Sequence, residues 1–96
     1  MTRIVVREIV WDAWNIEHIK KHRVTPEEIT VSLRNTSYHK RAHSGRYLVV
    51  GRAAKRIITV VLRRKKSTAY YIVTARDANK KERRDLYEKE DTSNRK

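Results

Sequence analysis

The sequence predicts one α+β domain: an N-terminal strand and two helices, then a three- to four-stranded antiparallel meander and a C-terminal helix. Three observations support this order. Two helix-start signals fall before residue 35, runs rich in β-branched residues occupy residues 46–75, and a third helix-start signal follows at Asn79. The 96 residues suffice for one modest core. We expect the domain at residues 1–89 and a flexible polar tail at residues 90–96.

The N-terminal elements are defined mainly by their caps. Residues 3–10 are rich in Val and Ile and predict a strand. Asp12 is a good N-cap for a helix that ends near residue 22. Thr25, followed by proline and then by Glu28 three residues on, forms a capping box that starts a second helix, ending near residue 34.

The remaining elements alternate between strands and short turns. The predicted strands cover residues 37–41, 46–52, 57–62 and 69–75, with turns or loops at 43–45 and 65–68. The run at 57–62 is continuously apolar, which is typical of a central strand buried on both faces. Asn79 and Glu82 form a third capping box, and the helix that they start has Leu86 and Tyr87 as its sizeable apolar anchors.

Positive charge is concentrated in one part of the chain. The net charge is +13, from 24 Lys and Arg against 11 Asp and Glu. Residues 1–35 carry a net charge of +1, and residues 36–96 carry +12. Such an asymmetric field attracts polyanions, and nucleic acid is the commonest partner of this kind. A solvated surface without a partner is the alternative.

Several classes of protein are excluded by composition. Cysteine is absent, so disulfides, thiolate zinc sites and cysteine nucleophiles are impossible, and a reducing compartment such as the cytoplasm fits. The charged N-terminal run lacks the features of a signal peptide or a membrane span. Phosphate-binding glycine loops, dinucleotide fingerprints and serine elbows are also missing.

Two segments resemble a known family. The first has Trp11 and Asp12, followed by Lys21-His22 and an acidic helix start at residues 25–28. The second has Arg46 and a glycine five residues later, then an alanine–arginine strand end at residues 75–76 and a basic helix from residue 79. In this order the motifs are similar to those of the BrnT toxin family. The family has glycine after lysine–histidine, where this sequence has Arg23.

The resemblance implies a fold, an activity and a partner. The fold would be RelE-like, and the activity would be that of a ribonuclease toxin of a type II toxin–antitoxin pair. The partner would be a small DNA-binding antitoxin, in a heterotetramer that represses its own operon.

The residues themselves favour a phosphate site around the third capping box. RNA cleaves itself when its 2′-hydroxyl attacks the adjacent phosphorus, so a protein need only orient the groups, move protons and stabilise charge. Arg76 ends a strand and can grip phosphate oxygens, close to a helix N-terminus that attracts anions. The nearby cations on this helix are Lys80, Lys81, Arg83 and Arg84, and we expect Arg46 and Arg52 to bind RNA as well. A solvated cationic helix is the alternative.

Proton transfer has several candidates. His39 and His43 lie near the basic strands and titrate near neutrality, although both could be ordinary surface residues. Glu82 could act as a base, but its capping role also explains it. Tyr87 could donate a proton to the leaving oxygen or stack on a base. We expect no metal and no cofactor, because His18 and His22 stand four apart on a helix without a third ligand.

Two functions are therefore compatible with the sequence. The first is an endoribonuclease toxin that cleaves RNA without a metal and is neutralised by an antitoxin. The second is a non-catalytic basic module that binds RNA or only a protein partner.

Overall fold

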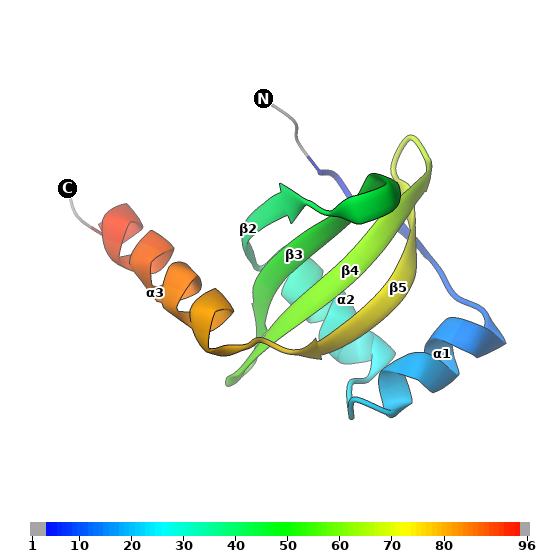
Figure 1. Cartoon of the computed structure of the whole chain (residues 1–96), viewed down its shortest axis with the longest axis horizontal. Helices are drawn as coiled ribbons and strands as arrows, with labels where there is room; N and C mark the ends of the chain where they lie inside the picture. The colour runs from blue at the N-terminus through cyan, green and yellow to red at the C-terminus, as the bar shows by residue number, and fades with distance from the viewer. Residues whose placement is uncertain (1–3, 95–96) are drawn as a thin grey trace.

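The computed structural model describes residues 4–94, which form three α-helices, a 3₁₀ turn and five strands (Figure 1). In chain order these are β1 (Glu8–Val10), α1 (Ala13–Lys20), α2 (Pro26–Arg34), β2 (Thr36–Arg41), the 3₁₀ turn η1 (His43–Gly45), β3 (Arg46–Ala53), β4 (Arg56–Lys66), β5 (Ala69–Asp77) and α3 (Lys80–Asn94). The predicted α+β class is confirmed.

The five strands form one sheet in the order β1-β5-β4-β3-β2. Strands β2 to β5 pair antiparallel with their neighbours in sequence, whereas β1 lies parallel to β5 at the edge. Figure 1 shows α2 behind the sheet, α1 beside β5, and α3 extending away from the sheet. The helices thus leave much of one sheet face uncovered.

The core lies mainly between the sheet and the first two helices. Ile19 of α1 and Ile29 of α2 are fully buried against alternate residues of the central strands, among them Val60 and Ile72. A smaller cluster on the other face joins Val50 and its neighbours to Leu86 of α3. The first turns of α3 therefore dock on the sheet through a single large buried apolar side chain.

Three helix caps form as predicted. Asp12 accepts a hydrogen bond from the Asn15 amide, Thr25 and Glu28 complete the capping box of α2, and Asn79 caps α3. The structure adds that the Asn15 side-chain oxygen accepts a hydrogen bond from the Asp12 amide at 2.8 Å. Within residues 4–94, no helix is long and apolar enough to cross a membrane.

The limits of several elements differ from the prediction. Strand β1 begins only at Glu8, although the strand was predicted from residue 3, which is itself outside the described residues. Helix α1 ends at Lys20 because Arg23 turns into the left-handed region at φ +58°. Strand β4 runs to Lys66 and takes in half of the loop predicted at 65–68, because Lys66 pairs with Ala69. Helix α3 continues past residue 90, where a tail was predicted.

Gly51 allows α2 to lie close to β3. A Cβ atom at this position would be 2.3 Å from the Ser32 carbonyl oxygen and 2.9 Å from that of Asn35. Any larger residue would push α2 off the sheet. The glycine five residues after Arg46 therefore has a packing role.

Candidate active site

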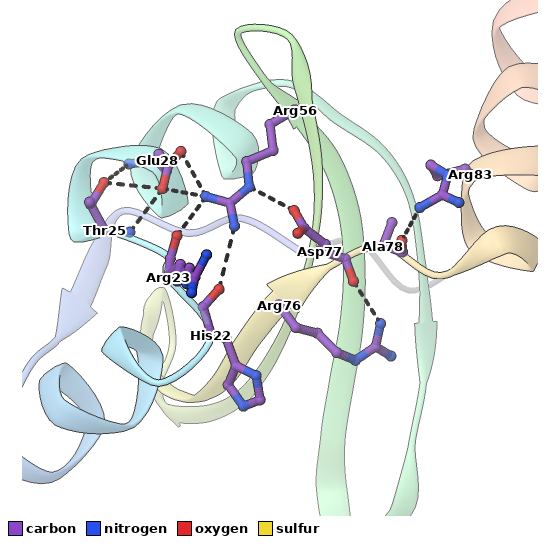
Figure 2. Close-up of polar contacts among 9 residues, drawn as sticks. All are labelled: His22, Arg23, Thr25, Glu28, Arg56, Arg76, Asp77, Ala78 and Arg83. Atoms are coloured by element: carbon purple, nitrogen blue, oxygen red, sulfur yellow. Dashed lines mark hydrogen bonds and ion pairs between the residues drawn. The ribbon is translucent and has the colours of Figure 1, made fainter.

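Arg76 and Glu82 form a bidentate ion pair where β5 leads into α3. The Arg76 Nη1 and Nη2 atoms donate to the two Glu82 carboxylate oxygens at 2.8 and 3.0 Å. Arg76 Nη1 also donates to the Asp77 carbonyl oxygen at 3.2 Å, as Figure 2 shows. Glu82 is buried, whereas the Arg76 side chain is 36% exposed. The pair thus fixes a guanidinium that is still open to solvent.

One edge of the Arg76 guanidinium is left for a ligand. Glu82 and the Asp77 carbonyl use both Nη1–H groups and one Nη2–H. The Nε–H and the second Nη2–H share an edge and donate to no residue within the described part of the chain. Two parallel N–H groups of this kind match two oxygens of a phosphate.

Glu82 is held by several donors at once. Its Oε1 atom accepts hydrogen bonds from the Asn79 amide and from the Thr59 hydroxyl, both at 2.8 Å, besides that from Arg76. Burial raises the pKa of Glu82, but the hydrogen bonds and the charge of Arg76 outweigh burial and lower the pKa to about 2. A carboxylate with this pKa accepts a proton poorly at neutral pH. Capping and positioning of Arg76 therefore account for Glu82 better than a role as general base.

The sheet face opposite α1 and α2, here called the open face, carries Arg76 and further cations. Side chains alternate along a strand, so the register places Arg76 beside Thr59 on the open face, with Arg46 and Arg63 farther along it. Arg63 is four residues from Thr59 on β4, a separation of about 13 Å.

Arg46 and Arg63 are directly opposite each other on β3 and β4, and both are exposed. Like charges in this position repel each other. The Arg63 guanidinium lies 5.4 Å from the centre of the Tyr71 ring, and among the described residues no carboxylate pairs with either arginine. An anion bound between the two side chains would relieve this repulsion.

Arg52 and Tyr87 form a separate group at α3. Arg52 donates from Nε and Nη2 to the two Glu90 carboxylate oxygens at 2.6 and 2.9 Å, and its guanidinium lies 5.8 Å from the centre of the Tyr87 ring. The Arg52 charge, which was predicted to bind RNA, is therefore offset by Glu90. Tyr87 is 52% exposed and is available for stacking.

The other predicted cations of α3 lie on its exposed surface. Lys80, Lys81 and Arg84 are exposed, and Lys81 pairs with Asp85 at 3.1 Å. Arg83 folds back to donate to the Ala78 carbonyl oxygen at 2.6 Å (Figure 2). Arg83 thus lies against the connection between β5 and α3.

The two candidate histidines are not brought to Arg76. His39 pairs in register with Val49, which faces the helices, and it lines a small pocket with Ile4 and Leu33 on that side of the sheet. His43 is exposed in η1, next to the end of β3 that carries Arg46. The sheet separates His39 from Arg76, and nearly the length of a strand separates His43 from it.

Sequence reasoning did not identify Arg56, which connects three segments beside the candidate site. Its Nε donates to the Asp77 carboxylate at 2.6 Å and its Nη1 to Glu28 at 2.9 Å (Figure 2). Its Nη atoms also donate to the carbonyl oxygens of His22 and Arg23 at 3.4 and 2.7 Å. Arg56 thereby ties the α1–α2 connection to the end of β5. These partners are more than 20 residues away in sequence, so no local pattern could have indicated them.

Metal ligands are not gathered anywhere within residues 4–94, where no group of three His, Asp or Glu side chains is placed to hold an ion. The His18 and His22 rings instead contact each other edge to face, with their centres 5.6 Å apart.

The fold is similar to that of a solved protein, the ribonuclease toxin BrnT of Brucella abortus. The match has a TM-score of 0.62 at 21% sequence identity, and it covers 76% of this chain and 97% of BrnT. No protein-family model matches the chain, and no curated protein matches its sequence. The similarity confirms the BrnT-like fold expected from the sequence motifs.

Proposed function

We propose that this protein is an endoribonuclease toxin that binds RNA on the open face and cleaves it at Arg76 without a metal ion. The observation that carries the proposal is the free Nε–Nη2 edge of Arg76, held in place by buried Glu82. The BrnT-like fold and the cations Arg46 and Arg63 on the same face support it.

The chemistry is that of internal transfer within RNA. The 2′-oxygen bonds to the adjacent phosphorus, and the bond from phosphorus to the 5′-oxygen of the next nucleotide breaks. The 2′-hydroxyl loses its proton and the leaving oxygen gains one, so the products are a 2′,3′-cyclic phosphate and a 5′-hydroxyl. Negative charge grows on the non-bridging oxygens during attack, and the Arg76 edge is suited to stabilise that charge.

A second candidate is a basic module that binds RNA without cleaving it. The observation that favours this alternative is the placement of the proton-transfer candidates. His39 is on the other side of the sheet, His43 is far along it, and Glu82 has a lowered pKa. Tyr87 lies in the separate group with Arg52, so proton transfer at Arg76 depends on water or on groups of the RNA itself.

Cleavage of RNA in the presence of a chelator distinguishes the two functions. The purified protein is incubated with total RNA and EDTA, and the fragment ends are analysed. Fragments with 5′-hydroxyl and cyclic or 3′-phosphate ends support the toxin proposal. Arg76→Ala is expected to lower turnover by roughly a hundredfold, the effect of one lost electrostatic donor. Arg34→Ala, which removes the same charge from exposed α2, is the matched control.

Intact RNA after incubation with correctly folded wild-type protein favours the binding module. Activity that disappears with the chelator contradicts the metal-free chemistry. Full cleavage by a folded Arg76→Ala variant moves the active site elsewhere, with His39 and His43 as the next candidates.

The proposal includes an antitoxin partner in the cytoplasm. We expect a small DNA-binding protein, encoded beside this chain, to form a heterotetramer with it and suppress RNA cleavage. Co-expression followed by light scattering on the purified complex measures both stoichiometry and neutralisation. A neighbour that neither binds nor restores growth contradicts this part of the proposal.

A further inference from the structure

Helix α1 displays a row of aromatic rings on its surface. Trp14 and His18 are four residues apart on α1 and share one helix face, and His22 follows in the turn after α1, where its ring contacts that of His18. The Trp14 and His18 rings are stacked, with centres 4.7 Å apart and planes 9° from parallel. Trp14 is 56% exposed, the most exposed of the large apolar side chains of the described residues.

Core packing does not account for this row. The buried residues of α1 are Asn15 and Ile19, and the other tryptophan, Trp11, packs against the main core cluster. Trp14 belongs to neither core cluster. An exposed indole held parallel to an imidazole is a rigid, flat surface that is already oriented before any ligand arrives.

The surroundings of Trp14 favour a nucleic-acid base over a protein surface. A shallow hollow of about 400 Å³ beside the ring is lined by Ala13, Glu17, His18 and Lys21 as well as by Trp14. Trp14 and Ala13 are the apolar residues of this lining, whereas the surfaces that mark protein docking are contiguous apolar patches of a few hundred Å² or more. Aromatic rings beside cations are typical of sites for single-stranded RNA, where the ring stacks on a base and the cation holds a phosphate.

The row is also connected to the end of β5, where the candidate active site lies. The His22 carbonyl oxygen accepts a hydrogen bond from Arg56, and Arg56 pairs with Asp77, the residue after Arg76 (Figure 2). From His22 to Trp14 is eight residues of α1 and its C-terminal turn, a distance of about 12 Å. Arg76 faces the open face and α1 lies on the other side, but among the described residues β1 pairs only with residues 69–71 of β5. A single strand with one phosphate at Arg76 can therefore pass over the unpaired edge at the end of β5 and continue along α1.

We propose that Trp14, supported by His18, is a stacking platform for a base of single-stranded RNA on the same strand as the phosphate bound at Arg76, more than one nucleotide away from it. The position of the strand rests on the proposed function, whereas stacking itself does not require cleavage. Lys21 is the residue placed to contact the phosphate of the stacked nucleotide.

The proposal is tested by comparing the binding of two polyanions, one that carries bases and one that does not. Short oligoadenylate and inorganic polyphosphate are titrated into the wild type and into Trp14→Ala. Oligoadenylate should quench the fluorescence of Trp14, and Trp14→Ala should weaken its binding by roughly fivefold to 150-fold, the effect of one stacked base. Polyphosphate binding should stay unchanged, because the phosphate contacts are intact. Trp14→Phe should restore most of the oligoadenylate affinity.

The controls separate stacking from folding and from catalysis. Val31→Ala, which trims an exposed apolar residue of α2, should bind both ligands as the wild type does. Thermal melting should be the same for Trp14→Ala and the wild type, since the ring is exposed. Arg76→Ala should still show quenching by oligoadenylate even where cleavage is lost.

Unchanged oligoadenylate affinity in Trp14→Ala overturns the platform, whatever the result of the cleavage assay. An equal loss of affinity for both polyanions also overturns it, because that pattern shows a general loss of charge contacts. Failure of cleavage together with normal quenching rejects the proposed function and leaves the platform in place.

Discussion

Arg76 and Glu82 are six residues apart, and their ion pair joins the last residues of β5 to the first turn of α3. Glu82 serves two purposes with one carboxylate: it caps α3 through the Asn79 amide and it holds the guanidinium of Arg76. The start of the helix and the orientation of the candidate catalytic arginine are therefore set by the same group.

Two variants should separate the contribution of the Arg76–Glu82 pair to stability from its contribution to RNA cleavage. Arg76→Ala leaves buried Glu82 without its charged partner, so we expect the free energy of unfolding to fall by about 1–3 kcal/mol. Adding Glu82→Gln to this variant removes the buried charge and should recover part of the loss. Cleavage should not recover, because the guanidinium is still missing. Urea unfolding and RNA cleavage of both variants measure the two roles, and cleavage restored by the double variant would contradict them.

Acid should destabilise the protein through Glu82. The pKa of this carboxyl is about 2 in the folded protein, against an ordinary value of 4.5 in the unfolded chain. Because the folded pKa is the lower one, the stabilisation is fully present above pH 4.5 and is lost as the pH falls towards 2. The difference corresponds to about 3 kcal/mol.

Urea unfolding across this pH range measures the effect. Other carboxyls with lowered pKa values, among them Glu28 and Asp77, add stability loss in the same direction. We therefore compare the wild type with Glu82→Gln, whose unfolding free energy should depend less on pH. Glu17→Gln, at an exposed site on α1, should keep the wild-type dependence of the unfolding free energy on pH. Identical slopes for all three proteins would show that Glu82 is not the group responsible.

The parts of the fold that sequence predicts well are local. Thr25 and Glu28 are three positions apart in sequence, as are Asn79 and Glu82, so a capping box can be recognised without knowing the rest of the structure. Charge on the C-terminal half and the BrnT-like motifs are also visible in the sequence alone. The position of Arg76 at a strand end, just before the third capping box, could likewise be predicted from neighbouring residues.

The parts that sequence misses depend on register and on distant contacts. His39 points towards the helices because a register shift between Thr36 and Tyr38 sets the pairing of β2, and one residue of shift would have turned it to the open face. The parallel pairing of β1 with β5 joins segments that are far apart in sequence, such as Glu8 and Ala69. Arg56 likewise depends on partners in α2 and β5.

Arg23→Gly should stabilise the protein. Arg23 has a left-handed backbone at φ +58°, a region that favours glycine, and glycine is the residue that the BrnT motif has there. We expect about 1 kcal/mol of added stability, or a rise in Tm of about 4–8 °C for a domain of this size. The hydrogen bond from Arg56 to the carbonyl oxygen of residue 23 is kept, because residue 23 accepts it with its backbone and not with its side chain.

Lys21→Gly is the matched control for this prediction. Lys21 is also exposed but has a right-handed helical backbone at φ −60°, so glycine there should lower the Tm. Calorimetry of the two variants should show opposite shifts. A lower Tm for Arg23→Gly would mean that the Arg23 side chain contributes more than the strained backbone costs.

Removal of Arg46 should raise stability and weaken RNA binding at the same time. Arg46 and Arg63 face each other across β3 and β4 without a carboxylate partner among the described residues, so the folded protein bears their repulsion. Replacing Arg46 by glutamine relieves about 0.2–1 kcal/mol. If the pair binds phosphates, the same change loses one neutralised phosphate. The slope of log affinity against log salt should then fall by about 0.7 for single-stranded RNA.

Urea unfolding and salt titrations of RNA binding measure these two effects on the same Arg46→Gln variant. Arg34→Gln, on α2 at the other face, should leave the salt slope unchanged. If Arg46 served only solubility, Arg46→Gln would leave the salt slope of RNA binding unchanged. If Arg46 stabilised the fold, Arg46→Gln would lower the free energy of unfolding. A higher free energy of unfolding together with weaker RNA binding is therefore the result that identifies Arg46 and Arg63 as an RNA contact.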